Sequence, residues 1–217
     1  MTRRIGGLVA AAIVQLVALV LAHDLVFLAR YGSRYNEELV HAGHGGTWAA
    51  AAETSLALGA LLAAAGLFRL VRLRLLLRGG QSNTGRHGSL PIRSMLEAWR
   101  RAALLIAPTT VALLTIQENI ERWAVTHQLP GPAILLTPEY AGGLWIALLV
   151  GLAVALVVAL FQWRRATLLA RLHAARQRLL RAATNHARHT GVEINPPADS
   201  LLGRRSALRA PPKVLAI

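Results

Sequence analysis

The side chains that could carry chemistry lie in three short segments, each beside an apolar run. They are His23 and Asp24, His41 and His44 in HAGHGGTW, and Glu118 and Glu121 in TIQENIERW. On a helix, residues three positions apart share a face, so the HxxH and ExxE spacings can each direct two ligands at one ion. Two close carboxylates also repel unless a cation or a proton lies between them. These residues predict a divalent-metal site.

Glu53 is a further candidate ligand because it stands inside the second apolar run. A carboxylate in a bilayer costs about 2.5–3.5 kcal/mol, so it is usually buried against a partner. We therefore expect Glu53 to face the protein interior beside Glu118 and Glu121. The alternative is a shallow position near the headgroups, since a span that begins at Trp48 would place Glu53 only about 7–8 Å deep.

The ligand types limit the cofactor. The chain has no cysteine and two methionines, so thiolate sites and cysteine-linked haem are excluded. Nitrogen and oxygen ligands suit Cu(II), Zn, Fe or Mn. Haem bound by two histidines is the less favoured cofactor, because candidate pairs occur at one side of the runs only. No GxSxG, HExxH or GxGxxG motif is present, so the sequence names no reaction.

Four apolar runs must position these residues. About 20 helical residues cross a bilayer core of about 30 Å. The runs therefore predict an all-α integral membrane four-helix bundle within 1–165. The expected spans are 5–23, 47–70, 102–120 and 142–163. The first run could instead be a cleaved signal peptide, but its apolar stretch is longer than such segments usually have.

The basic residues predict the topology. Of 24 Lys and Arg residues, 21 lie in the first four residues, in 69–101 or after Trp163. Basic flanks stay in the cytoplasm. We therefore expect both termini to be cytoplasmic in a cell (plasma or inner) membrane, with loops 24–46 and 119–142 outside. This arrangement puts every candidate ligand at the outer side.

The net charge of +14 is explained by the same topology. The stretch 166–189 mixes leucine with arginine and predicts a basic cytoplasmic helix, while 190–217 is expected to be disordered. Anionic lipid headgroups are the expected partner of these basic residues. We do not expect nucleic-acid binding.

Three functions are compatible with these patterns. The leading one is an outward-facing His/Glu metal site, used in metal handling or in a small membrane metalloenzyme. The second is a structural or assembly subunit of a membrane complex, in which the polar residues cap helices and bond to other subunits. The third is an ion- or proton-coupled transporter that uses Glu53. Whether the protein is an enzyme is left open.

Overall fold

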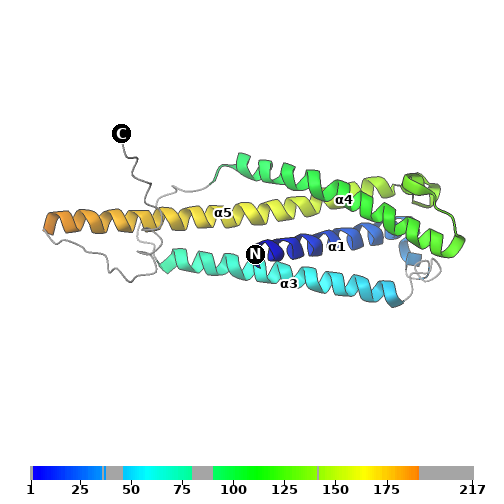
Figure 1. Ribbon diagram of the computed structural model, residues 1–217, viewed down its shortest axis with the longest axis horizontal. Coiled ribbons are helices and arrows are strands. Elements are labelled where there is room, and N and C mark those ends of the chain that lie inside the picture. Colours follow the sequence, from blue (N-terminus) through cyan, green and yellow to red (C-terminus); the bar gives the residue numbers. More distant parts are fainter. Residues whose placement is uncertain (1, 36, 38–45, 80–89, 141, 191–217) are drawn as a thin grey trace, which may run out of the picture. The chain divides into compact units, whose positions relative to one another are not determined.

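The computed structural model describes residues 2–35, 37, 46–79, 90–140 and 142–190. All regular elements in these ranges are helical, which confirms the all-α part of the predicted fold class (Figure 1). The long helices are α1 (Thr2–Tyr31), α3 (Gly46–Gly79), α4 (Ile92–Thr126) and α5 (Gly143–Thr190). Short 3-10 helices are η1 (Gly32–Arg34), η2 (Gly131–Leu136) and η3 (Pro138–Tyr140). The chain forms two compact units, 1–172 and 173–217.

Four helices are long and apolar enough to cross a membrane, as the apolar runs predicted. Each extends beyond its predicted span. α4 begins directly after Pro91 rather than at 102, and the Ser94 hydroxyl and N–H both bond to the Pro91 carbonyl at its start. Bilayer thickness limits the apolar run but not the helix, because polar flanking residues continue the backbone ladder in water. The division into domains stays a prediction, and the tail 191–217 lies outside the described residues.

Small residues set how closely the helices of the first unit pack. A Cβ atom added at Gly151 of α5 would lie 2.5 Å from the Cα of Ala107 in α4. At Gly59 of α3 it would lie 2.6 Å from Cγ2 of Val17 in α1. Gly151 therefore lets the backbones of α5 and α4 approach each other, as small residues commonly do between membrane helices, while Gly59 leaves room for the Val17 side chain.

A polar contact joins α1 and α4 inside their apolar stretches. Gln15 donates from Nε2 to the hydroxyl of Thr110 over 2.9 Å, and that hydroxyl donates to the Ile106 carbonyl over 2.8 Å. Thr110 is fully buried two residues after Pro108, which interrupts the α4 hydrogen-bond ladder. The contact therefore ties α1 to α4 close to the proline.

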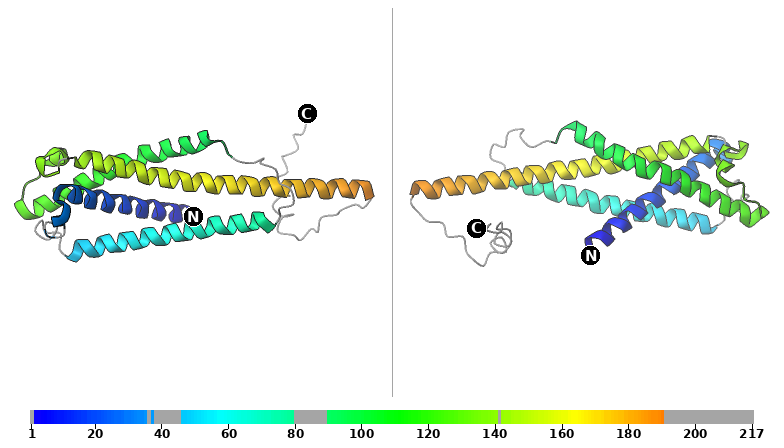
Figure 2. Two further views of the ribbon diagram at one scale, coloured as in Figure 1. Left: turned by 180° about the vertical axis from the view of Figure 1, so that it is seen from behind. Right: turned by 45° about the horizontal axis from the view of Figure 1, so that its top comes forward.

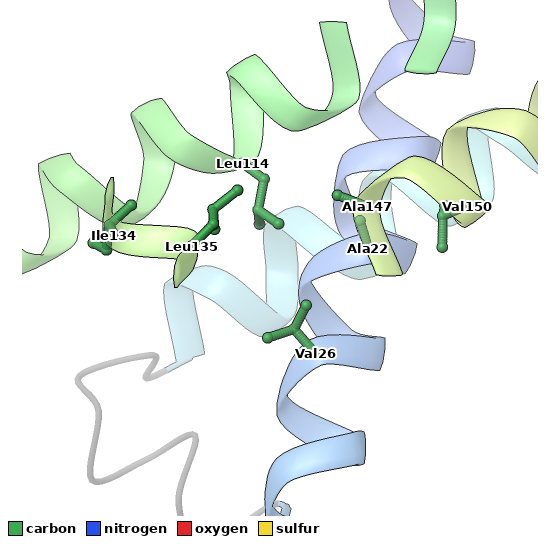
Figure 3. Packing of buried hydrophobic residues seen from close by; sticks show 7 residues of the cluster. All are labelled: Ala22, Val26, Leu114, Ile134, Leu135, Ala147 and Val150. Atoms are coloured by element: carbon green, nitrogen blue, oxygen red, sulfur yellow. The ribbon is translucent and has the colours of Figure 1, made fainter. Parts of the chain in front are cut away.

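At one end of the first unit, α1 and α4 end and α3 and α5 begin (Figure 2). We call this the polar end, because the candidate ligands lie there. An apolar core packs beside them at the same end. Its buried side chains come from α1, α4, η2 and α5 (Figure 3). They are Ala22, Val26, Leu114, Ile134, Leu135, Ala147 and Val150. Ala22 directly precedes His23, and Leu114 lies about one turn before Glu118. The packing of this core therefore sets the position of both candidate ligands.

Candidate metal site at the polar end of the first unit

Three candidate ligands meet at the polar end. α1 supplies His23, and α4 supplies Glu118 and Glu121. One ligand atom from each lies within 4.8 Å of the others. We call these residues the His–Glu group. The i, i+3 spacing of the two glutamates puts both on the face of α4 that meets α1, as a helix of 3.6 residues per turn requires.

The geometry of the His–Glu group fits a single ion. His23 Nε2 and Glu118 Oε1 are 3.6 Å apart. Two ligands of a tetrahedral ion, each about 2.1 Å from it, lie about 3.4 Å apart. The two atoms could therefore bind one ion almost where they stand, and Glu121 would need only a small side-chain movement.

Burial makes this group unusual. His23 is fully buried and Glu118 is 1% exposed, whereas Glu121 is half-buried. Buried ionisable groups are costly unless they are paired or bind a metal. Glu118 Oε1 has no hydrogen-bond partner among the described residues, although it faces the imidazole. A cation between these side chains would satisfy that oxygen.

Neighbouring side chains hold the His23 ring. Phe27, one turn along α1, stacks on it with ring centroids 4.7 Å apart, and Trp48 of α3 approaches to 4.2 Å. At the ring edge, Nδ1 lies 3.3 Å from Oδ1 of Asp24. An Nδ1–H donated to that carboxylate leaves Nε2 with the lone pair that binds metals. Tyr35, the next described residue after η1, belongs to the same surroundings, since burial and then the Asp24 charge raise its pKa to about 12.

Tyr140 of η3 holds Glu118 from the other side. Its hydroxyl donates a hydrogen bond to Glu118 Oε2, which leaves Oε1 directed at His23. Burial raises the pKa of Tyr140 above its ordinary range, and the nearby Glu118 charge raises it further. The phenol therefore stays a neutral donor. Glu121 is held within α4, because Gln117 Nε2 donates to its Oε1 over 3.1 Å.

Asn119 fixes the segment that brings Tyr140 to the site. Its Oδ1 accepts the Gly131 N–H over 2.7 Å, and its Nδ2 donates to the Gly131 carbonyl over 2.9 Å. Gly131 has a φ of +71°, a conformation that glycine adopts without strain. Beyond it, Ile134 and Leu135 enter the apolar core, and the chain then returns to α5 through Tyr140.

The predicted site residues therefore separate into three sets. His23, Glu118 and Glu121 come together, while Asp24 lies beside His23 but outside the His–Glu group. Glu53 is exposed on α3 and is not part of the group, contrary to the expected interior position beside Glu118. His41 and His44 lie outside the described residues, so their role stays a prediction.

The sequence patterns did not identify Tyr140 or Asn119. Both lie in or beside the expected outer loop 119–142, and topology alone puts that loop near Glu118. A loop of this length has no periodicity that would tell which of its side chains turns inward. Comparisons with protein families, with curated proteins and with solved structures found no match for the chain.

Proposed function

We propose that this protein is a four-span membrane protein whose His–Glu group binds one divalent metal ion. The observation that carries the proposal is the convergence of His23, Glu118 and Glu121, with ligand atoms within 4.8 Å of one another in a largely buried setting. One nitrogen and two oxygen ligands suit Zn²⁺, Fe²⁺, Mn²⁺ or Cu²⁺. Three protein ligands leave a coordination position open, as in metal sites that act on a substrate.

The burial of the ligands favours an ion that stays bound over one that is transported. His23 is fully buried and Glu118 almost so, and aromatic rings cover the imidazole. A transport site must be weak enough to release its ion and must be reached from both sides. Glu53, the one acidic side chain expected within the second span, is exposed rather than paired with Glu118. We therefore prefer a retained metal centre to a transporter.

We place this site at the outer face of the cell membrane, with both termini in the cytoplasm. The support is the clustering of 21 of 24 basic residues in the first four residues, in 69–101 and after Trp163, stretches that four membrane spans would leave on one side. Single cysteines at Ser33 and Ser82 can be introduced into this cysteine-free chain. An impermeant thiol reagent should label Ser33→Cys in intact cells and Ser82→Cys only after lysis. The reverse pattern would invert the topology.

Anionic lipid is the partner that we propose for the cytoplasmic side. Arg164, Arg165 and Arg171 are exposed on α5 where its apolar run ends. Each basic residue near an anionic surface contributes about 1 kcal/mol. Reconstituted protein should therefore enrich anionic over zwitterionic lipid around it. Replacing these three arginines with glutamine should reduce the enrichment.

The metal itself is tested by binding. Protein purified in detergent and stripped with a chelator should take up one ion per chain, and its melting temperature should rise. An ion at 100 times its Kd stabilises the fold by about 2.7 kcal/mol. His23→Gln and the double variant Glu118→Gln/Glu121→Gln should abolish both effects. Glu53→Gln, an exposed carboxylate of the same kind, is the matched control and should retain them.

One observation favours the alternative that the protein is a structural or assembly subunit of a membrane complex. Glu118 accepts a hydrogen bond from Tyr140 and so already joins α4 to η3 without any ion. If wild-type protein binds no metal while Glu118→Gln lowers its melting temperature, the group is a structural lock and the metal proposal fails. His41→Ala/His44→Ala should be measured alongside, because a loss of metal in that variant would restore the larger ligand set that the sequence predicts.

A further inference from the structure

Two side chains outside the His–Glu group contact its members, and the metal proposal does not include them among the ligands. Asp24 bonds to the far nitrogen of His23, and Tyr140 bonds to the far oxygen of Glu118. In each case the atom that is bonded is the one directed away from the other ligand. Both contacts therefore orient a metal ligand and do not themselves supply one.

We propose that Asp24 and Tyr140 are positioning residues, which select Nε2 of His23 and Oε1 of Glu118 as the atoms presented to the metal. This inference rests on the proposed metal centre and goes beyond it by assigning the ligand atoms and their supports. Outer partners of this kind fix the tautomer of a ligating histidine and the rotation of a ligating carboxylate.

The contact between His23 and Asp24 is not what a helix produces by default. Adjacent residues on an α-helix point about 100° apart and do not normally face each other. Here Nδ1 and Oδ1 nevertheless lie 3.3 Å apart, and Phe27 and Trp48 hold the ring plane. With the ring plane held by two aromatic rings, Asp24 decides which nitrogen carries the hydrogen. The nitrogen left without it is Nε2, 3.6 Å from Glu118 Oε1.

Tyr140 does the same for Glu118 from a different part of the chain. The Asn119–Gly131 clamp and the burial of Ile134 and Leu135 hold the η2–η3 segment against the bundle. Tyr140 therefore stands on a fixed backbone when it donates to Oε2. Rotation of the Glu118 carboxylate would break this bond, so Oε1 stays directed at the imidazole. Oε1 has no hydrogen-bond partner among the described residues, which leaves it available to an ion.

Co²⁺ provides a probe that separates orientation from folding. It binds nitrogen and oxygen ligands like the metals named above, and its visible absorption bands report the geometry of the ligand atoms. Asp24→Asn and Tyr140→Phe should each weaken Co²⁺ binding about 10- to 100-fold. At saturating Co²⁺ both should shift the absorption bands, because the ligand atoms would be less well aligned. Asp24→Glu, which keeps the carboxylate, should recover part of the affinity.

The matched controls are Glu37→Gln, an exposed carboxylate beyond η1, and Tyr31→Phe, a partly buried tyrosine on α1. Both should keep the wild-type affinity and bands. If wild-type protein binds Co²⁺ but Asp24→Asn and Tyr140→Phe match it in affinity and spectrum, the positioning roles are wrong while the metal centre stands. If wild-type protein binds none, both proposals fail. If one of these two variants does not fold, the other still tests the positioning proposal, because Asp24→Asn acts on His23 and Tyr140→Phe acts on Glu118.

Discussion

Tyr140 donates a hydrogen bond to Glu118 across 22 residues of chain, and this contact links the loop before α5 to a carboxylate buried in α4. Glu118 is 1% exposed, so both of its oxygens need partners from the protein or from a ligand. The phenol satisfies one oxygen, and the other faces the His23 imidazole at 3.6 Å. The Glu118 side chain therefore both anchors the loop before α5 and belongs to the candidate metal site.

The Glu118–Tyr140 contact should appear as a coupling energy in metal-free protein. Glu118→Ala leaves the partly buried phenol without its acceptor, and Tyr140→Phe leaves the buried carboxylate without its donor. Each should lower the free energy of unfolding by about 1–3 kcal/mol, because an unsatisfied buried polar group costs that much. A double-mutant cycle from equilibrium unfolding in detergent should give a coupling of about 0.5–3 kcal/mol. Additive effects would mean that the two groups do not bond.

Tyr35 should make the fold less stable at alkaline pH. Its pKa is about 12 in the folded protein, against about 10 in an unfolded chain. The folded state therefore holds this proton more tightly, and the stabilisation present below about pH 10 is lost as the pH rises through the folded pKa. Tyr35→Phe should reduce the loss of stability over this interval, measured by thermal unfolding.

Absorbance at 295 nm provides the control for Tyr35, because it follows phenolate formation directly. Asp24→Asn removes a charge that raises the pKa of Tyr35, so one tyrosine should then ionise at a lower pH. A titration curve that is identical in wild type and Asp24→Asn would show that Tyr35 does not sense Asp24.

The Asn119 clamp should hold η2 against α4. Asn119→Ala removes the partners of both the Gly131 N–H and its carbonyl, so the 131–136 segment should exchange its amide hydrogens faster. The free energy of unfolding should fall by about 1–3 kcal/mol. Gln128→Ala, at an exposed residue of the same loop, is the control and should change neither quantity. Unchanged exchange in Asn119→Ala would show that Ile134 and Leu135 suffice to hold the segment.

Gly151 should tolerate no side chain. A Cβ atom there would lie 2.5 Å from the Cα of Ala107, so Gly151→Ala must push α5 away from α4. Overpacking of this kind costs about 1–3 kcal/mol. Gly6→Ala is a matched control on α1, because a Cβ at Gly6 meets nothing within 4 Å. Thermal unfolding of both variants in detergent measures the difference, and equal melting temperatures would contradict the close contact.

Much of this architecture could be predicted from local patterns. The helical class and the four spanning candidates follow from runs of apolar residues, because in a bilayer the backbone must bond to itself. The pairing of Glu118 with Glu121 follows from helical periodicity, which is a property of α4 alone. The helix ends were less predictable: α1 continues to Tyr31, so His23 and Asp24 lie within it rather than at its exit.

The sequence alone determined which residues could be ligands and which of them share a helix face. Only the tertiary structure decided which of them meet. Glu53 and Glu118 both lie in apolar helices, yet one is exposed and the other buried, because the rotation of each helix about its axis is set by packing at contacts such as Gly59–Val17. Tyr140 reaches Glu118 because Asn119 fixes the loop at Gly131. The burial of Glu118 rather than Glu53 and the approach of Tyr140 to Glu118 both depend on contacts between distant segments. The periodicity of a single segment does not encode such contacts.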